Sequence, residues 1–285
     1  METDFRHIPL GNDFAFAEVM KESDICRCFL ETVLKIRIRE LVYTDKQKDL
    51  TDSLLYHGIR LDVYVEDDKN TVYNIEMQNR LESLKRVRYY QSGIDRRMLK
   101  KNLDYTALGQ TYIVCVCNFD QTGLKYPMYE RTMQLECPAG NGLYDDGTHV
   151  VLLNAKFDEK YRNELPEICE YLELINQREE IDLSKYRYEL AVKAADGLDR
   201  LRKDEAKGVA FMTFEQKIRE EARYARAEGE KTGLEEGMRK GLQEGLEEGR
   251  REGRKEGRLK MREEDIRKLM ERLSISREKA EELLS

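Results

Sequence analysis

Two short strand-forming runs separated by a polar turn constrain the fold of this chain more than any other feature. The runs are GIRLDVYV (58–65) and YNIEMQNR (73–80). Both are rich in β-branched and aromatic residues, and we expect strands over 59–65 and 71–78. The stretch between the runs contains EDDKN, whose residues favour turns. The sequence therefore predicts a strand hairpin in the first third of the chain.

Each predicted strand carries a carboxylate in its middle, Asp62 in the first and Glu76 in the second. Acidic residues are depleted in strands. Because side chains alternate along a strand, Glu76 and Gln78 share one face. A turn with an odd number of residues, centred on Lys69, pairs Asp62 with Glu76 and brings their Cβ atoms to about 5 Å. An even turn separates them and leaves a sheet face with unrelated polar residues.

A carboxylate pair at that distance has a chemical consequence. Two ionised carboxylates repel each other, so one needs a raised pKa or the pair needs a bound cation. Oxygen ligands suit Mg²⁺ or Mn²⁺. Such an ion binds a phosphate and lowers the pKa of a bound water, and Gln78 lies where it can orient that water or contact the phosphate.

The order of the remaining elements predicts an α/β sandwich around a mixed sheet. Apolar residues recur at helical spacing over 13–36, and the stretch 166–206 reads as charged helices. CPAGNGLYDDGTH (137–149) reads as a loop. We expect a helix over 82–101 and further strands over 37–43, 111–118 and 149–153.

A basic segment, residues 85–101, lies inside an acidic chain whose net charge is −7. The net charge argues mildly against a nucleic-acid partner, but it hides local fields. Seven basic residues and two polar neighbours are candidate DNA contacts, with a solvated helix face as the alternative. They are Lys85, Arg86, Arg88, Tyr90, Gln91, Arg96, Arg97, Lys100 and Lys101.

Glycine falls at every fourth position from 229 to 257, with Glu, Lys and Arg between. A period of four exceeds 3.6 residues per turn, so the glycine stripe drifts by about 40° per repeat. Two interpretations stay open: a charged, partly frayed helix or flexible spacer, and a self-associating helix. Beyond it we expect a helical hairpin with Ser276 as an N-cap. Its apolar face comprises Ile266, Leu269, Met270 and Leu273.

These features divide the chain into four parts. We expect a core over 1–165, a helical region over 166–228, the glycine repeat over 229–258 and the helical hairpin over 259–285. No apolar run approaches the roughly 20 residues of a membrane span, and the N-terminus lacks signal-peptide features. The six cysteines show no C-x-x-C spacing. We expect a cytoplasmic protein without a structural metal.

The spacing of Asp62, Glu76 and Gln78 resembles the D…(E/D)-x-K core of the PD-(D/E)xK nucleases. The glutamine in the lysine position is similar to the Rpn family, recombination-promoting nucleases also described as putative transposases. NDFAFAEVM (12–20) resembles the opening helix of that family and places Asp13 at its first acidic position. RVRYYQSGIDRRMLKKNLDYTAL (86–108) resembles its second helix, and the glycine-every-four tail is typical of it.

The resemblance implies a restriction-endonuclease-like α/β core, a mixed sheet flanked by helices, with a mostly helical C-terminal extension. It implies a Mg²⁺-dependent DNA endonuclease, a hydrolase that uses a metal-activated water and has roles in recombination or mobile elements. Carried over by position, Asp62 and Glu76 become metal ligands, with Mn²⁺ as an alternative ion. Gln78 takes the place of the catalytic lysine, and Asp13 is a further member of the catalytic set.

Three functions remain open at this point. The first is a divalent-metal DNA endonuclease. The second is a catalytically weak DNA-binding or interaction protein that keeps the nuclease fold and assembles through its C-terminal repeat. The third is a transposase, which needs strand transfer as well as cleavage. A homodimer through the C-terminal region would supply the two active sites that double-strand cleavage commonly uses, because a self-complementary patch closes on itself.

Overall fold

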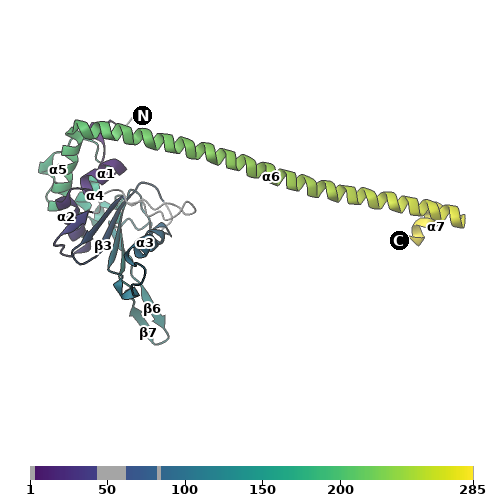
Figure 1. The fold of residues 1–285 in the computed structure, drawn as a ribbon, viewed down its shortest axis with the longest axis horizontal. Coiled ribbons are helices and arrows are strands. Elements are labelled where there is room, and N and C mark those ends of the chain that lie inside the picture. The colour runs from purple at the N-terminus through teal and green to yellow at the C-terminus, as the bar shows by residue number, and fades with distance from the viewer. Residues whose placement is uncertain (1–3, 44–61, 82–84, 285) are drawn as a thin grey trace. The chain divides into compact units, whose positions relative to one another are not determined.

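The computed structural model describes residues 4–43, 62–81 and 85–284 (Figure 1). The chain divides into two compact units, one ending at Phe214 and one beginning at Glu215. Residues 59–61 of the first predicted strand and 82–84 of the predicted basic helix lie outside the described residues.

The first unit is built on a mixed sheet of six strands in the order β1-β2-β3-β4-β8-β5. β1 to β3 pair antiparallel, β3, β4 and β8 pair parallel, and β5 closes the other edge antiparallel. The α/β fold with a mixed sheet predicted from sequence is confirmed. The strands are β1 (Leu41–Tyr43), β2 (Val63–Asp67), β3 (Val72–Gln78), β4 (Thr111–Cys117), β5 (Met128–Glu130) and β8 (Thr148–Asn154).

Helices cover the two faces of this sheet unequally, as Figure 1 shows. One face, with Tyr73, Ile75 and Met77 of β3, packs into a large apolar cluster with Phe211, near the start of the long helix α6 (Glu205–Leu273), and with four shorter helices. They are α1 (Asp13–Met20), α2 (Ser23–Leu34), α4 (Pro166–Glu173) and α5 (Glu189–Lys203). The other face packs a smaller cluster against α3 (Lys85–Met98) alone. Short 3₁₀ turns fill the connections: η1 (Phe5–His7), η2 (Tyr105–Ala107), η3 (Glu159–Tyr161), η4 (Leu174–Asn176) and η5 (Leu183–Lys185).

The register of β2 and β3 continues by one pair beyond Glu66 and Val72, because the N–H of Asp67 donates to the carbonyl of Thr71 at 3.0 Å. The turn between that pair has three residues, 68–70, and is held by the side chain of Asp67. Asp67 Oδ1 accepts hydrogen bonds from the backbone N–H groups of Lys69 and Thr71, both at 2.8 Å. Asn70 adopts a left-handed conformation with φ of 60°, which asparagine tolerates better than most residues. The turn therefore has an odd number of residues and is centred on Lys69. This is the sequence alternative that pairs Asp62 with Glu76.

Three details of the first unit differ from the sequence prediction. The predicted helix over 13–36 is two helices, because the chain leaves helical geometry at Glu22 and α2 starts at Ser23. The junction packs tightly on α5, where a Cβ on Gly197 would lie 2.6 Å from Ile25 Cδ1. The predicted strand over 37–43 is limited to its last three residues.

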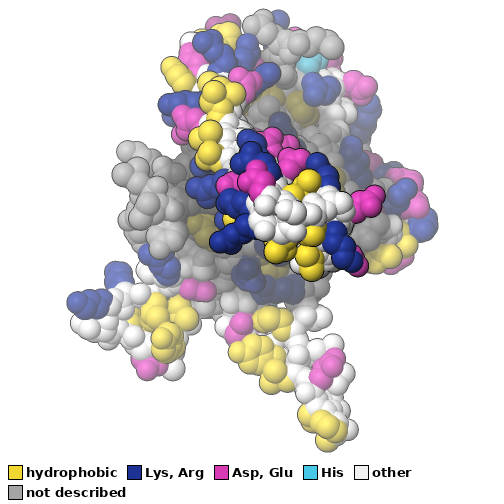
Figure 2. Space-filling view, turned by 90° about the vertical axis from the view of Figure 1, so that its right-hand side faces the viewer, with side chains coloured by type: hydrophobic (Ala, Val, Ile, Leu, Met, Phe, Trp, Pro, Cys, Tyr) yellow, Lys and Arg dark blue, Asp and Glu magenta, His cyan; other side chains and the backbone are white. Residues whose placement is uncertain are grey.

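The third difference is a hairpin that reaches into the stretch predicted as a loop, 137–149, where its second strand and the last residue of its first strand lie. β6 (Gln134–Cys137) and β7 (Gly140–Leu143) pair antiparallel as a separate two-stranded sheet. Every residue in both strands is exposed. In Figure 2 this hairpin is the lowest projection and shows hydrophobic and acidic side chains. The glycines, which a sequence reading associates with loops, here permit a tight hairpin, with Gly140 at φ of 139°.

The second unit consists of most of α6 (Glu205–Leu273) and α7 (Arg277–Leu283). α6 is one continuous helix through all eight glycines of the repeat, supported by pairs four residues apart such as Arg226–Glu230 at 3.0 Å. Ser276 precedes α7 in extended geometry, at the predicted N-cap position, and Ile266 of the predicted apolar face is buried. Within the described part of the chain, no helix has the length and hydropathy required to cross a bilayer.

Candidate functional site

The register of the hairpin brings the two predicted carboxylates to the same place. Val63 pairs with Ile75 and Tyr64 pairs with Asn74. Continued by one residue, this register sets Asp62 opposite Glu76, just before β2 begins. Directly opposed residues of an antiparallel pair point to one side of the sheet. That side is the one covered by α3, because Tyr64 and Val72 belong to the cluster under that helix.

Glu76 is an acidic residue buried inside the protein, with 1% of its surface exposed. Its Oε1 accepts a hydrogen bond of 3.0 Å from the side-chain amide of Asn74, two residues back on the same face. Burial raises the pKa of the Glu76 carboxyl well above its ordinary value, and the negative charge of Asp62 raises it further. The Asn74 amide and the guanidinium of Arg86 oppose this shift. The pair therefore has the electrostatics of a site that favours a proton or a cation.

Asp62 is fixed by the backbone of the neighbouring strand. Its Oδ2 accepts a hydrogen bond of 2.9 Å from the N–H of Met77, the residue after Glu76. The side chain is partly buried. This contact holds the Asp62 carboxylate beside β3 although the residue itself lies outside β2.

Gln78 is the last residue of β3 and lies at the carboxyl end of the parallel strands. It pairs with Cys117 of β4, and its carbonyl accepts a hydrogen bond of 2.9 Å from the N–H of Asn118. Its side chain is half-buried on the face that also carries Glu76. The structure therefore places Asp62, Glu76 and Gln78 on the face of the sheet under α3, near the edge at which the parallel strands β3 and β4 end. We call it the edge of the sheet under α3.

Asp13 reaches this edge from the opposite layer. It is the first residue of α1, and its Oδ1 accepts a hydrogen bond of 2.8 Å from the side-chain amide of Asn79, which directly follows Gln78. Partial desolvation raises the pKa of Asp13, whereas Asn79, Arg80 and Arg86 act to lower it. Asp13 and Glu76 thus lie within the electrostatic reach of the same guanidinium, that of Arg86.

A row of asparagines that sequence reasoning missed supports this arrangement. Asn79 also donates to the carbonyl of Gly11 at 2.8 Å, and it accepts from Asn118 at 3.4 Å. Asn118 in turn accepts from Asn176 at 2.9 Å. Asn79 and Asn118 each follow the last residue of a parallel strand, a position where polar side chains commonly gather in α/β proteins. Their place directly after predicted strands was the sequence signal that could have identified Asn79 and Asn118.

The predicted DNA-contact residues of α3 divide into two groups. Six of them are exposed along the helix or just beyond it: Lys85, Arg86, Arg88, Arg96, Lys100 and Lys101. Arg86 and the three less exposed residues make contacts within the protein. Arg86 lies over the ring of Tyr90, which is only 4% exposed, and Arg97 lies 5.5 Å from the ring centroid of Tyr64. Gln91 donates to Asp95 at 2.7 Å.

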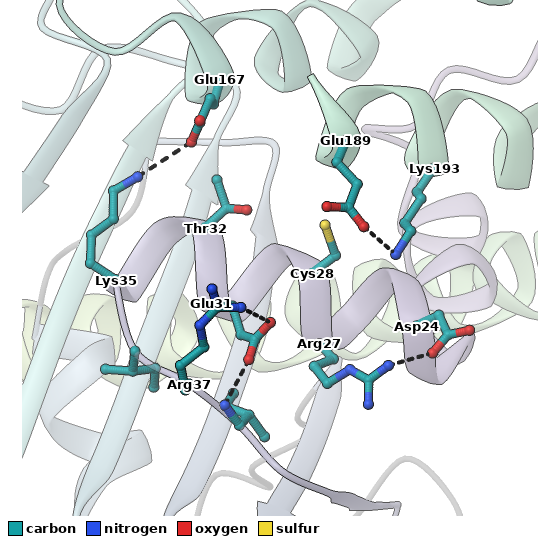
Figure 3. Close-up of a pocket in the computed structure, with 12 residues that line it drawn as sticks. Asp24, Arg27, Cys28, Glu31, Thr32, Lys35, Arg37, Glu167, Glu189 and Lys193 are labelled. Carbon is teal, nitrogen blue, oxygen red and sulfur yellow. Dashed lines mark hydrogen bonds and ion pairs between the residues drawn. The ribbon is translucent and has the colours of Figure 1, made fainter. Parts of the chain in front are cut away.

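A separate hollow of about 580 Å³ lies between α2, α4 and α5, on the other side of the sheet. Figure 3 shows that charged side chains of opposite sign pair with one another around it. Glu189 pairs with Lys193 at 2.7 Å, and Lys35 with Glu167 at 3.4 Å. This hollow shares no residue with the carboxylate pair, and its charges are already used in ion pairs. The edge under α3 is therefore the better candidate site.

The donor set at that edge consists of two carboxylates rather than a dense cluster. No group of three or more His, Cys, Asp or Glu side chains suited to a metal ion occurs among residues 4–43, 62–81 and 85–284. Beside Glu76, however, the Oδ1 of Asn74 is buried and has no hydrogen-bond partner within the described part of the protein. All of these atoms are oxygens, the ligand type that hard divalent cations prefer.

Comparison with known proteins gives one match. A family model described as PD-(D/E)XK nuclease family transposase matches residues 10–224. The matched span contains Asp13, both hairpin carboxylates and α3. No curated protein and no solved structure matches the chain.

Proposed function

We propose that this chain, which belongs to the PD-(D/E)XK nuclease family transposases, is a DNA endonuclease that hydrolyses phosphodiester bonds at the edge of the sheet under α3. The observation that carries the proposal is the buried Glu76 set opposite Asp62. A buried carboxylate beside a second one destabilises a fold unless it is protonated or paired with a cation. Such costly arrangements cluster at functional sites.

Asp62 and Glu76 are the proposed ligands of a divalent cation, Mg²⁺ or Mn²⁺. The fit rests on the all-oxygen donor set, on the repulsion between the two carboxylates, and on the orphaned Asn74 oxygen beside them. When bound, such an ion supplies Lewis-acid stabilisation of the phosphate and lowers the pKa of water.

The neighbouring side chains have positioning tasks in this proposal. Gln78 offers an amide that donates to a phosphate oxygen or orients a water, but it carries no charge and does not transfer protons. Asp13, held by Asn79, adds a further carboxylate at the margin of the site. In the hydrolysis a water oxygen forms a bond to phosphorus while the bond to the leaving strand breaks. One end keeps the phosphate and the other gains a hydroxyl.

The exposed basic residues of α3 and the turn after it are the proposed DNA contacts. Such contacts bind the phosphate backbone and give affinity without sequence information. Tyr90 is excluded from this set because it is buried beneath Arg86. The set comprises Lys85, Arg88, Arg96, Lys100 and Lys101.

Self-association through α6 is the second part of the proposal. The stretch 228–248 holds seven acidic and three basic residues, whereas 249–262 holds seven basic and two acidic. Two copies packed antiparallel about Gly249 bring each acidic stretch against a basic one. That arrangement also sets Gly245 against Gly253 and Gly241 against Gly257, where small residues allow close approach.

Deleting 229–285 tests this assembly. We expect sedimentation to show a dimer for the full chain and a monomer for the truncated one, with double-strand cleavage reduced more than nicking. The same oligomeric state for the two proteins would leave α6 as a solvated helix. A full-length variant with reversed charges at Arg250, Arg251, Arg254 and Lys255 keeps the helix length and should also be a monomer, because acidic stretches would then face each other.

The cysteines agree with the compartment predicted from sequence. All six are free thiols, and burial raises the pKa of Cys115 and of Cys117. Five of the six are buried, and Cys137 is exposed. Buried protonated thiols are inert towards oxidation. We include a cytoplasmic location in the proposal.

Cleavage of supercoiled plasmid tests the enzymatic proposal directly. The native chain should nick or linearise DNA with Mg²⁺ or Mn²⁺ and should be inactive in EDTA, and Asp62→Ala should be inactive with either ion. Asp68→Ala, an exposed carboxylate in the hairpin turn, is the matched control and should stay active. DNA binding without cleavage under every condition would instead support the catalytically weak binding protein.

A further inference from the structure

The proposed site lacks a positive charge on the strand that carries it. Negative charge builds up on the phosphate oxygens during hydrolysis, and a preorganised cation beside them is among the largest contributions to such catalysis. β3 reads VYNIEMQ and holds no lysine or arginine. Gln78, at the position next to Glu76 on the same face, contributes only a neutral amide. A positive charge at this site must therefore come from an element that packs against β3.

Contacts at its C-terminal end fix the direction in which α3 crosses the sheet. Met98 Sδ accepts a hydrogen bond of 3.8 Å from Thr111, and Thr111 pairs with Val72 at the start of β3. One residue earlier on the helix, Arg97 lies over Tyr64, which pairs with Asn74. The C-terminal end of α3 thus lies over the beginning of β3.

The N-terminal end of α3 must then lie over the end of β3. Arg86 precedes Arg97 by eleven residues, which is about 16 Å along a helix. From Asn74 to Gln78 the strand advances about 13 Å. The two lengths are similar, so a helix running antiparallel to β3 sets Arg86 near Gln78. A helix that connects two parallel strands, as α3 connects β3 and β4, runs in this direction.

The side chain of Arg86 is held towards the sheet by Tyr90. Its Nε donates a hydrogen bond to the hydroxyl of Tyr90, and its guanidinium carbon lies 5.1 Å from the centroid of that ring. Tyr90 is buried in the cluster that also contains Cys115 and Cys117, the partners of Glu76 and Gln78 in the register of β4. The guanidinium is thereby anchored above these two positions.

The electrostatics around Arg86 agree with this placement. Its positive charge lowers the pKa of Glu76 on β3 and of Asp13 on α1, against the burial that raises both. It acts in the same direction on Tyr90 and Cys115. Groups from four different elements therefore surround one guanidinium, which remains exposed enough to meet a ligand.

We propose that Arg86 is a catalytic residue that contacts the scissile phosphate and supplies, from α3, the positive charge that Gln78 does not supply from β3. This inference rests on the proposed nuclease function. Guanidinium matches phosphate oxygens in a two-pronged geometry and stays protonated throughout. No proton or bond to Arg86 changes in the reaction: the water oxygen still bonds to phosphorus as the leaving strand departs. The proposed role of Arg86 at the scissile phosphate differs from that of Arg88, whose side chain is proposed to bind the DNA backbone.

The test separates catalysis from binding with two measurements on the full chain. Single-turnover cleavage of a DNA duplex with Mn²⁺ gives the rate, and titration of the same duplex in EDTA gives the affinity. For Arg86→Gln we expect a rate lower by about 100- to 1000-fold, with an affinity changed by less than about threefold. For the matched variant Arg88→Gln we expect the loss in affinity. An Arg86→Gln variant that loses only affinity, as Arg88→Gln does, would overturn the proposal.

A second variant asks whether the missing charge is the reason. Gln78→Lys places a cation on the same face of β3, so the double variant Gln78→Lys/Arg86→Gln should recover at least about tenfold of the lost rate. Failure of Gln78→Lys to rescue a folded Arg86→Gln protein would overturn the proposal.

Tyr90→Phe distinguishes catalysis from a structural clamp. It removes the hydroxyl that Arg86 binds but keeps the ring. We expect Tyr90→Phe to lose less rate than Arg86→Gln, because the guanidinium is still present without its anchor. A loss larger than that of Arg86→Gln would overturn the proposal, because the hydroxyl would then matter more than the charge. Thermal melting of each variant establishes that it is folded. Failure of the underlying nuclease function would appear differently, as a native chain without metal-dependent cleavage.

Discussion

The two faces of the central sheet are made by the same strands but differ in what they bury. On β3, Tyr73, Ile75 and Met77 pack into the large cluster under four helices. Asn74 and Glu76, which alternate with them, are buried equally deeply on the other face, under α3 alone. One face of the strand is apolar, whereas the other begins with Val72 and continues with an amide and a carboxylate.

This difference shows how the protein divides stability from chemistry. Burial of apolar side chains contributes roughly 25 cal/mol per Å² and is the main favourable term in folding. A buried carboxylate opposes folding unless it is protonated or paired. The large apolar face can therefore offset the cost of the polar one. Substitutions on the two faces should consequently affect different measurements.

The largest expected effect is on the polar face. Asp62→Ala and Glu76→Ala should each lower the metal-dependent cleavage rate by about 1000-fold or more, because either change removes half of the proposed ligand set. Their midpoints in urea should stay at or above that of the native chain, since each change relieves carboxylate repulsion. A variant that retains both cleavage and Mn²⁺ affinity, measured by calorimetry, would remove these residues from the site.

The apolar face should respond in the opposite way. Ile75→Ala, at a position with no exposed surface, should lower the free energy of unfolding by about 2–5 kcal/mol. Gln78→Ala, three residues along the same strand and half-buried, should change it by less than about 0.5 kcal/mol. Urea unfolding of both proteins checks this. Equal losses of unfolding free energy would mean that both faces of the strand stabilise the fold to the same extent.

A third prediction concerns the pH dependence of stability in EDTA. The pKa of Glu76 is raised in the folded protein above its ordinary value of 4.5. The folded state therefore holds a proton that the unfolded state releases. The stability from Glu76 is full below pH 4.5 and is lost as pH rises through the folded pKa, by up to about 1.4 kcal/mol per pH unit.

Glu76→Gln provides the comparison for that prediction, because glutamine has similar shape and no titration. Urea unfolding of both proteins at several pH values should give a difference that grows in favour of the glutamine variant as pH rises. Parallel curves would show that Glu76 does not carry a buried proton. Adding Mn²⁺ to the native chain should reduce the difference, since a cation replaces the proton.

The smallest expected effect tests the outer surface of α3. Arg96→Gln should reduce the slope of log affinity for DNA against log salt by about 0.9, which is the value for one phosphate contact. The loss should be the same for all DNA sequences. Arg27→Gln, on α2 of the opposite face, is the matched control and should leave the slope unchanged. Identical slopes for both variants would return α3 to an ordinary solvated helix.

Local rules were enough to predict the hairpin, but not which of its two possible pairings it adopts. The turn residues, the alternation of apolar and polar side chains, and the parity about Lys69 all lie within about twenty residues. The family was also recognisable, from the spacing of Asp62, Glu76 and Gln78 taken together with the resemblance of 12–20, of 86–108 and of the glycine-every-four tail. The sequence left the parity open because the side chain of Asp67, which fixes the three-residue turn, competes with other turn geometries of similar energy.

The long-range parts of the site were not predictable from one sequence. Asn79, Asn118 and Asn176 meet through chain segments 39 and 58 residues apart, and no local pattern specifies such contacts. The inward turn of Arg86 depends on the direction of α3 over the sheet, which only tertiary packing sets. The conformation of the glycine repeat was ambiguous because two local effects oppose each other. Its helix propensity is poor, and the many charged pairs along α6 act against that preference.

The three-residue turn between β2 and β3 also limits how the gene for this protein can change in length. Loss or gain of a single codon between Asp67 and Thr71 would shift the pairing by one residue. Such a shift carries a residue to the other side of a sheet. Asp62 would then face the large apolar cluster, and Glu76 would lose its partner. Insertions or deletions of two codons preserve the parity, so length variants that keep Asp62 with Glu76 should differ in this turn by even numbers of residues.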